Sequence, residues 1–409
     1  MNQARIIIIG AGPAGLCAAI SAGRALSGKQ AEILILEGSA EAGKKLLISG
    51  SGQCNFTNNL ATDLFLASCE EFGNYLKPAF YSLNNTSLVE LINAAGCKHL
   101  VREDGKVFPA GMKASEVRDA LLNQVRQAGA KLSYEARVAS VEKMASGGFK
   151  LKLLSGQNLG CDKLIIATGG ASYPQTGSDG QGLKLAKSLG HQAVPFRTAL
   201  GNVELVGFGE YATCAGASLQ QMELSFISGK QKHIAIGDLL FTHSGFSGPV
   251  ILDNCHRVRA GDEISVCLLP NADILIGELK KRGRGITTLN ALQATGVPRS
   301  LLTVMLKRLS LSSTLALESY NKAALSPLLK ILKSFRFTIA KVQDISSSMA
   351  SAGGIPLAEI NAKTMQSRLC PGLFFAGEIM DYSLPTGGFN IQMACSTGWL
   401  AGSSAAKTL

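Results

Sequence analysis

The amino-acid sequence predicts an α/β fold in which a Rossmann-like domain with a parallel sheet is interrupted by an antiparallel β-barrel and a helical subdomain. Near the N-terminus, a β-branched strand runs into a glycine-rich turn and a helix, which is typical of a parallel sheet. Two later strands also end in small residues. Between them, alternating apolar segments predict antiparallel strands, and leucine-rich segments predict helices. The expected parts are 1–194 and 345–409 for the split Rossmann-like domain, 195–270 for the barrel-like insert and 271–344 for the basic helical subdomain.

The composition favours a folded protein with anionic partners. Of the 409 residues, 46% are hydrophobic and 17% are charged, so the chain can form a core and is not predominantly disordered. The formal net charge of +11 favours nucleic acid, phosphorylated ligands or an acidic membrane surface, without choosing among them.

Other classes of protein are disfavoured by patterns that the sequence lacks. No apolar run approaches the ~20 residues that span a bilayer, and the N-terminal apolar run is too short for a secretory signal. The ten cysteines form no CxxC pair, and the five histidines show no metal-ligand spacing. We therefore expect no metal, no membrane association and a reduced, cytoplasmic compartment.

The first forty residues carry a dinucleotide-binding fingerprint. Arg5–Ile9 is a predicted buried strand that runs directly into G-x-G-x-x-G, followed by a stretch of helical composition. In this pattern Gly10 permits the tight turn, Gly12 lets the backbone approach a pyrophosphate, and Gly15 lets the helix pack closely on the strand. The helix N-terminus would then face the phosphates.

An acid at the end of the second predicted strand extends the fingerprint. Residues 31–36 are apolar and lead into Glu37, a position from which a carboxylate can hydrogen-bond a ribose hydroxyl. A glutamate suits NAD and the adenosine half of FAD equally, so this part of the pattern does not separate them. The structural alternative is a βαβ turn that binds no phosphate.

Two later segments point to FAD. The strand at 161–166 is followed by Ala-Thr-Gly-Gly, and the strand at 372–375 leads to Gly377 and Glu378, before a predicted C-terminal helix. This combination resembles the two-dinucleotide-binding-domain flavoproteins. The resemblance implies that the Ala-Thr-Gly-Gly strand returns beneath FAD and that the acid lies on the flavin side. It also implies that the last helix directs its N-terminus at the flavin pyrimidine.

Further blocks resemble the YhiN-like family, also labelled the aminoacetone oxidase family of FAD-binding enzymes. These blocks are residues 43–58, 103–109, 169–178, 240–249 and 363–368. The resemblance implies the same architecture, an FAD-binding domain with an inserted β-barrel and helical subdomain. Ser51 and Gln53 stand where the family tends to have glycine and arginine, which puts the substrate in doubt more than the cofactor.

We expect both parts of the Rossmann-like domain to contribute to the FAD site. The expected cofactor-binding residues are Gly10, Gly12, Ala14, Gly15, Glu37, Lys45, Ser49, Gly50, Val138, Thr168, Gly169, Gly170, Gly377, Glu378, Asp381, Gly388, Phe389, Asn390 and Ile391. Only one clear dinucleotide fingerprint is visible, and FAD uses it. NAD(P)H, the candidate electron donor, would need a transient site.

Three residues are candidates for catalysis. Hydride would come from the flavin, so the protein needs to bind, orient and protonate the substrate. Cys54, in a glycine-rich loop, is a candidate general acid or a small packed residue in a tight turn. Asn55 is a candidate hydrogen-bond partner for a flavin or substrate carbonyl. His243 is either an acid–base group, because its ordinary pKa lies near the operating pH, or a residue that holds its loop by a hydrogen bond.

Most of the excess positive charge lies in one segment. Residues 271–344 contain twelve basic and four acidic residues, a balance of +8. Their densest cluster is predicted to bind RNA; its members are Lys280, Lys281, Arg282 and Arg284. The alternative is a solvated helix face.

Three functions remain open at this point. The favoured one is FAD-dependent reduction of an activated C=C bond, in particular of uridine to dihydrouridine in ribosomal RNA, which the resemblance links to family members. A second is an oxidoreductase of small molecules, either an aminoacetone-type amine oxidase or a reductase of an unsaturated steroid ketone. The third is an FAD-containing protein that binds RNA or ribosomes without turnover.

Overall fold

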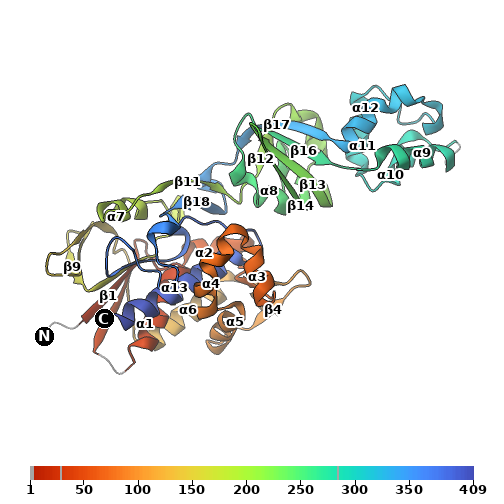
Figure 1. The fold of residues 1–409 in the computed structure, drawn as a ribbon. Coiled ribbons are helices and arrows are strands. Elements are labelled where there is room, and N and C mark those ends of the chain that lie inside the picture. The colour runs from red at the N-terminus through yellow and green to blue at the C-terminus, as the bar shows by residue number, and fades with distance from the viewer. Residues whose placement is uncertain (1–3, 28–29, 283–284) are drawn as a thin grey trace. The chain divides into compact units, whose positions relative to one another are not determined.

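The computed structural model describes residues 4–27, 30–282 and 285–409, without the side chain of Arg282, and divides into two compact units (Figure 1). The first unit comprises Met1–Arg197 and Ile345–Leu409, and the second comprises Thr198–Asp344. The first unit is therefore built from both ends of the chain. Within the described ranges, no helix has both the length and the apolar character needed to cross a membrane.

A five-stranded parallel sheet forms the centre of the first unit. Its order is β19-β10-β1-β2-β6, from Leu373–Phe375, Lys163–Ile166, Ala4–Ile9, Ala31–Leu36 and Lys131–Ser133. The four isoleucines of β1 are buried, as expected for a central strand that is covered on both faces. The predicted Rossmann-like fold is confirmed.

Helices and two small antiparallel sheets surround this sheet. The helices are α1 (Pro13–Ala25), α2 (Lys44–Ile48), α3 (Thr62–Ser68), α4 (Gly73–Ser82), α5 (Asn85–Ala94), α6 (Ala114–Gln127), α7 (Gly182–Ser188) and α13 (Phe389–Lys407). The small sheets are β3-β5-β4 (Thr57–Asn58, Lys106–Pro109, His99–Val101) and β7-β8-β9 (Val138–Lys143, Phe149–Leu153, Asn158–Cys161). Strands β11 (Val194–Ala199) and β18 (Ala350–Gly354) pair where the chain leaves the first unit and returns to it.

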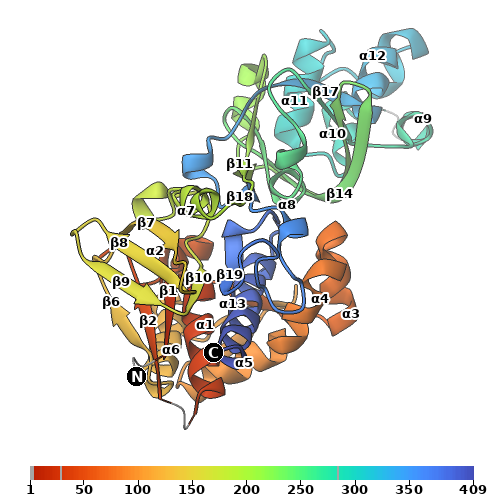
Figure 2. The same cartoon turned by 60° about the vertical axis from the view of Figure 1, so that its left-hand side comes forward.

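The C-terminal helix α13 packs along α1, the helix that follows the glycine-rich turn (Figure 2). Small residues allow this close approach. A Cβ atom added at Gly398 would lie 2.1 Å from the Ala14 carbonyl oxygen, and one at Gly402 would lie 2.0 Å from the Ala18 carbonyl oxygen. The Ser21 hydroxyl also donates a hydrogen bond across the seam to the Trp399 carbonyl, at 2.7 Å.

Because α1 and α13 pack so closely, we expect a single glycine substitution between them to destabilise the protein strongly. Gly402→Val is expected to lower the free energy of unfolding by about 3 kcal/mol, because the added atoms meet the Ala18 backbone, which cannot move aside, as well as the Ser21 hydroxyl. Urea unfolding followed by circular dichroism measures this. Gly277→Val is the matched control, since a Cβ at Gly277 has no atom within 4 Å. Equal stability of the two variants would contradict the close packing.

The second unit is a closed six-stranded barrel with helices. The barrel order is β12-β15-β14-β13-β16-β17, from Val203–Leu205, Gly245–Ser247, Gln231–Phe241, Ser218–Ser228, Glu263–Cys267 and Phe335–Val342. A connected cluster of aromatic rings fills it, formed by Phe208, Tyr211, Phe241, Phe246, Phe335 and Phe337. The helices are α8 (Pro249–Leu252), α9 (Ala272–Arg282), α10 (Thr288–Gln293), α11 (Arg299–Arg308) and α12 (Lys322–Lys333).

One part of the sequence-based division is wrong. Strand β17 closes the barrel, although it lies inside 271–344, where the sequence analysis predicts a helical subdomain. Its residues alternate between buried and exposed from Phe335 to Ala340, which is the two-residue period of a strand. The alternating pattern is short and directly follows the leucine-rich helix α12, so the sequence analysis included it in the helical segment.

Candidate functional site

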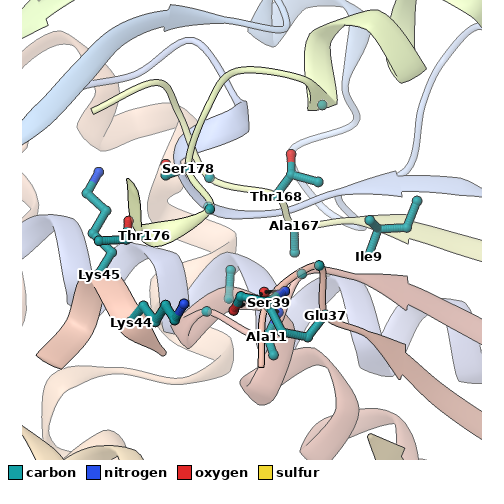
Figure 3. A pocket seen from close by; sticks show the side chains of 18 of the residues that line it. Ile9, Ala11, Glu37, Ser39, Lys44, Lys45, Ala167, Thr168, Thr176 and Ser178 are labelled. Carbon is teal, nitrogen blue, oxygen red and sulfur yellow. Dashed lines mark hydrogen bonds between the residues drawn. The ribbon is translucent and has the colours of Figure 1, made fainter. Parts of the chain in front are cut away.

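A cleft in the first unit lies at the carboxyl ends of four parallel strands. The turns after β1, β2, β10 and β19 all line it, with α2 and residues 136–138, 176–179 and 181–182 (Figure 3). In open parallel sheets, ligands bind at this edge. Of the expected cofactor-binding residues, those that line the cleft are Gly10, Gly12, Ala14, Glu37, Lys45, Val138, Thr168, Gly169, Gly377 and Glu378.

The three fingerprint glycines have three different environments. Gly10 has a φ of 102°, and an added Cβ would lie 2.5 Å from the Ala167 carbonyl oxygen. A Cβ at Gly15 would lie 1.9 Å from the Gly10 carbonyl oxygen, so Gly15 brings α1 against the turn. A Cβ at Gly12 would meet no atom within 4 Å, although Gly12 lines the cleft. Its open side is therefore available to a ligand.

Glu37 joins the turn after β2 to the turn after β1. Its carboxylate accepts hydrogen bonds from the Ala11 backbone N–H at 2.8 Å and from the backbone N–H and hydroxyl of Ser39 at 2.9 and 2.8 Å. A carboxylate offers about four acceptor positions, so capacity remains for a ligand hydroxyl. On the rim, Arg137 forms an ion pair with Asp179 and donates to the Gln181 side chain at 3.2 Å.

Two hydroxyl groups lining the cleft are available to a polar ligand. The side-chain oxygens of Thr168 and Ser178 are buried and have no hydrogen-bond partner among the described residues. Buried polar groups are rarely left unpaired, because desolvation costs about 1–3 kcal/mol each. A ligand with hydroxyl and phosphate groups would satisfy them. The glycine cradle, Glu37 and these hydroxyls thus fit a dinucleotide such as FAD.

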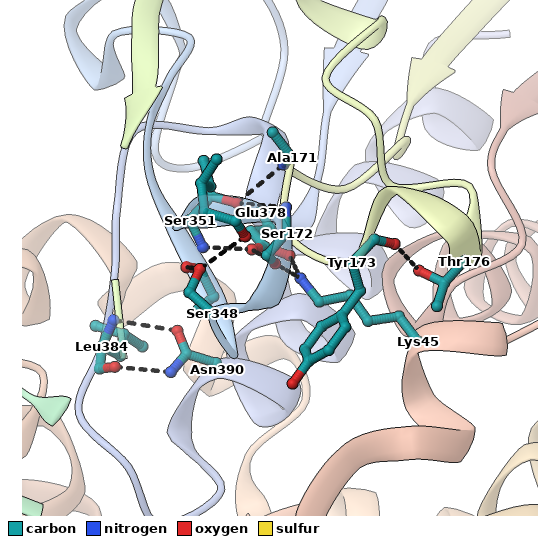
Figure 4. A network of polar contacts seen from close by, with 12 residues as sticks. Lys45, Ala171, Ser172, Tyr173, Thr176, Ser348, Ser351, Glu378, Leu384 and Asn390 are labelled. Carbon is teal, nitrogen blue, oxygen red and sulfur yellow. Dashed lines mark hydrogen bonds and ion pairs between the residues drawn. The ribbon is translucent and has the colours of Figure 1, made fainter. Parts of the chain in front are cut away.

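A polar network joins four distant segments beside the cleft (Figure 4). The Lys45 ammonium lies 2.6 Å from the Glu378 carboxylate and also contacts the Ser172 hydroxyl. The other carboxylate oxygen of Glu378 accepts from the Ser351 backbone N–H at 2.7 Å. The Ser351 hydroxyl in turn accepts from the backbone of Ala171 and Ser172, at 2.9 and 3.1 Å. Charged and donor groups are therefore fixed where Lys45 of α2 meets Glu378 in the turn after β19.

The start of α13 is shaped by the loop before it. The Asn390 side chain accepts from the Leu384 N–H at 3.1 Å and donates to the Leu384 carbonyl at 2.7 Å. Gly388 has a φ of 96°, and an added Cβ would lie 2.5 Å from the Thr57 carbonyl oxygen. Phe389 is buried and Ile391 is half-buried. Asn390 therefore has a structural role at this helix N-terminus, in addition to any contact with a cofactor.

The loop from Ser49 to Asn55 has an unusual backbone. Gly50, Ser51, Gly52 and Cys54 all have positive φ, and Ser51 takes this conformation, at 55°, without being glycine. The Asn55 side-chain oxygen is buried with no partner in the described part of the chain, so this acceptor is available to a ligand that donates a hydrogen bond. The neighbouring departure from the family pattern, Gln53, accepts a hydrogen bond from Arg102 at 3.0 Å.

Cys54 lies inside the protein rather than at its surface. Its side chain is 0% exposed, and burial raises the pKa of its thiol to about 12. The packed role is therefore the simpler account of Cys54 in this conformation, and its role as a general acid stays a prediction. Asp381, also near the start of α13, has its pKa raised by burial, with Arg197 opposing that shift.

The cysteines give a prediction for solution chemistry. Nine of the ten are buried, and Cys267 alone is partly exposed, with a pKa that burial raises above the usual thiol value. Ellman's reagent is expected to titrate about one thiol in the native protein, and more slowly at pH 8 than an ordinary thiol. The rate should increase as the pH rises, because only the thiolate reacts. Mass spectrometry locates the labelled residue. Labelling of Cys54 at a comparable rate would contradict its burial.

The predicted site residues of the second unit do not line the cleft of the first unit. His243 is exposed in the turn between β14 and β15, and no hydrogen bond to its ring is found among the described residues. The ammonium of Lys280 is hydrogen-bonded to the Tyr320 carbonyl, whereas Lys281 is exposed. Arg284 and the Arg282 side chain lie outside the described residues. The proposed RNA-binding cluster thus has one described, freely exposed cation.

Sequence reasoning missed four polar residues of the site. These are Arg137, Ser172 and Ser351, which contact residues far along the chain, and Ser39, which contacts Glu37 two residues before it. Serines in loops carry no periodic signal, and only the motif block at 169–178 could have pointed to Ser172. In the ranges that the structure describes, no group of three or more His, Cys, Asp or Glu side chains is placed to hold a metal.

Comparisons with known proteins cover nearly the whole chain. A family model described as the HI0933-like protein Rossmann domain matches residues 4–404. The "Ribosomal RNA dihydrouridine synthase" of Escherichia coli (strain K12) is 30% identical over 406 residues, 98% of this chain and 97% of that protein. The "3-dehydro-bile acid delta(4,6)-reductase" of Clostridium scindens is 30% identical over 421 residues, 98% of this chain and 99% of that protein.

Solved structures show the same fold. The crystal structure of 3-ketosteroid delta1-dehydrogenase from Sterolibacterium denitrificans superposes with a TM-score of 0.54 at 13% identity, covering 100% of both chains. At that identity the likeness concerns the fold alone.

Proposed function

Because the chain belongs to the HI0933-like family of FAD-dependent oxidoreductases, as the motif blocks indicated, we propose that the cleft of the first unit is its FAD site. The Gly10–Gly15 turn would hold the pyrophosphate, and Glu37 the adenosine ribose. Thr168 and Ser178 would bind ribityl or phosphate oxygens with hydroxyls that otherwise lack partners.

The remaining expected contacts belong to the flavin end of this proposal. Bound FAD would supply reversible hydride transfer at its ring. Lys45 and Glu378 would orient that end through their fixed ion pair, and the unpaired Asn55 side-chain oxygen would accept a hydrogen bond from a ring or substrate N–H. The N-terminus of α13, at Gly388, would favour negative charge near the ring.

We further propose that the substrate is a uridine base of ribosomal RNA, whose C5=C6 bond is reduced to give dihydrouridine. The observation that carries this proposal is the full-length similarity to the Escherichia coli protein named for that activity. A second protein of that name, from Haemophilus influenzae, is 27% identical over 96% of each chain. The reduction needs an external reductant, for which NAD(P)H is our candidate.

A second candidate function is reduction of an unsaturated steroid-like ketone. The equally similar Clostridium scindens protein, named as a bile acid reductase, favours it. Both candidate reactions add hydride and a proton across a C=C bond that a carbonyl polarises. They differ in the size and charge of the substrate. Amine oxidation of the aminoacetone type is the remaining small-molecule alternative.

Mapping of modified nucleosides in ribosomal RNA tests the RNA proposal. A strain that lacks the gene is expected to lose one or more dihydrouridines, and the wild-type gene is expected to restore them. A Gly12→Val gene should not restore them. Unchanged dihydrouridine content in the deletion strain would refute the RNA substrate, and purified protein would then be assayed against unsaturated ketones with NADH and NADPH.

A further inference from the structure

The outer face of the barrel contains a polar hollow of about 170 Å³, which we call the barrel groove. Its floor includes three serines, Ser225, Ser265 and Ser334, and its rim carries three cations, Lys232, Lys333 and Arg336. All six residues lie in the second unit, so the groove is separate from the cleft at the parallel sheet.

The strand register explains why a hollow forms here. Ser225 of β13 lies opposite Ser265 of β16, which lies opposite Arg336 of β17. Their sequence neighbours, such as Phe226, Ile264 and Phe337, point into the barrel, so these residues point outward. Two small side chains side by side leave a depression, and the long basic side chains border it.

Hydrogen bonds connect the polar groups on the floor of the groove to one of its rim cations. The Ser265 and Ser334 hydroxyls are hydrogen-bonded at 2.8 Å, and Arg336 donates through Nε to the Ser334 hydroxyl, also at 2.8 Å. The Nε contact fixes the guanidinium and leaves its terminal N–H groups for a ligand. An arginine held in this way suits bidentate binding of a phosphate group.

The charge around the groove is predominantly positive. Lys333 forms an ion pair with Asp273, and Glu223 is an acid of the lining. No described acid lies within ion-pair distance of Lys232 or Arg336. Two of the three rim cations are thus left for an anion, and the exposed Lys330 lies one helical turn from Lys333 on α12.

We propose that the barrel groove binds a phosphodiester group of a single RNA strand. This inference rests on the proposed RNA substrate for its choice of ligand. One phosphate would contact Arg336, Lys232 and the serine hydroxyls, and its neighbour along the strand would face α12. Such contacts position a strand without reading its sequence. An acidic lipid surface fits less well, because the donors line a hollow rather than a plane.

Cys267 provides a direct reporter of occupancy, because it lines the groove and is the only partly exposed cysteine. The experiment labels full-length, FAD-loaded protein with a maleimide, with or without a 20-nucleotide RNA. RNA is expected to slow the labelling of Cys267 at least tenfold, and added salt should remove the protection. The labelling rate of Cys267 is also measured with inorganic phosphate at the same total phosphate concentration, and with anionic phospholipid vesicles.

Substitutions test whether the groove residues contribute to the affinity for RNA. Arg336→Gln and Lys232→Gln are each expected to weaken RNA binding about threefold to tenfold, as measured by fluorescence anisotropy. Each should also make the slope of log affinity against log salt concentration shallower by about one. Lys341→Gln is the matched control, because Lys341 lies on the same strand, is paired with Asp344 and does not line the groove. It should bind RNA as the wild type does.

Several outcomes would overturn the proposal. They are an absence of protection by RNA, an equal loss of affinity in Lys341→Gln, or equal protection by inorganic phosphate. Stronger protection by vesicles than by RNA would assign the groove to a membrane surface instead. Failure of the groove proposal is distinguishable from failure of the proposed function. Loss of dihydrouridine in the deletion strain without RNA protection of Cys267 would refute only the groove, and protection with unchanged ribosomal RNA would refute only the reaction.

Discussion

Replacement of Gly12 by valine is expected to abolish the retention of FAD while the protein remains folded. A Cβ at Gly12 meets no protein atom within 4 Å, and the backbone there, with φ −77° and ψ −179°, is accessible to any L-residue. The added side chain would instead occupy the side of the turn that faces the cleft, where a pyrophosphate must approach. FAD affinity should fall at least about 100-fold, equivalent to about 2.7 kcal/mol.

Flavin absorbance after gel filtration and titration of the apoprotein with FAD measure this loss. Gly209→Val is the matched control, since a Cβ at Gly209 also meets nothing within 4 Å, and the residue lies outside the cleft. The control should be yellow and release FAD on denaturation. A Gly12→Val protein that retains FAD with wild-type affinity would contradict the assignment of the cleft.

Breaking the Lys45–Glu378 pair is the second substitution with a large expected effect. Both side chains are about one-quarter exposed, at 25% and 23%, and the pair lies 2.6 Å apart. Glu378→Gln would leave the Lys45 charge without its carboxylate and would weaken the acceptor for the Ser351 N–H. We expect it to cost about 2 kcal/mol of stability, below the ~3–5 kcal/mol of a fully buried pair. The flavin reduction potential should also change.

A double-mutant cycle separates the pair from its surroundings. Lys45→Met, Glu378→Gln and the double variant are compared by urea unfolding and by the midpoint potential of the bound flavin. The double variant should be more stable than the sum of the two single losses predicts, because neither charge is left alone. Strict additivity of the losses would show that the two groups do not interact.

The sequence predicted the parts of the site that depend on neighbouring residues. The turn at Gly10–Gly15 and the acid Glu37 follow from local rules of strand, turn and helix, and the structure places both at one edge of the sheet. The Lys45–Glu378 pair joins residues 333 positions apart, so it depends on the topology of the whole unit. No local pattern encodes such a contact.

The burial of Cys54 and the closure of the barrel by β17 also could not be predicted from local sequence patterns. The glycine-rich setting of Cys54 left a general acid and a small packed residue equally open, and only the fold shows that the thiol lies in the core, on a backbone with positive φ. Strand β17 follows a leucine-rich helix after only one residue, and its partners β12 and β16 lie far earlier in the chain. Its strand state is decided by these partners rather than by composition.

The division of the first unit between both ends of the chain has a consequence for biosynthesis. The second unit is continuous, from Thr198 to Asp344, so all of it is translated before β19 and α13. Until then the parallel sheet lacks its edge strand, and α1 lacks the helix that covers it. Nascent chains should therefore acquire protease resistance first in the barrel. The ability to bind FAD should appear only with the last residues translated.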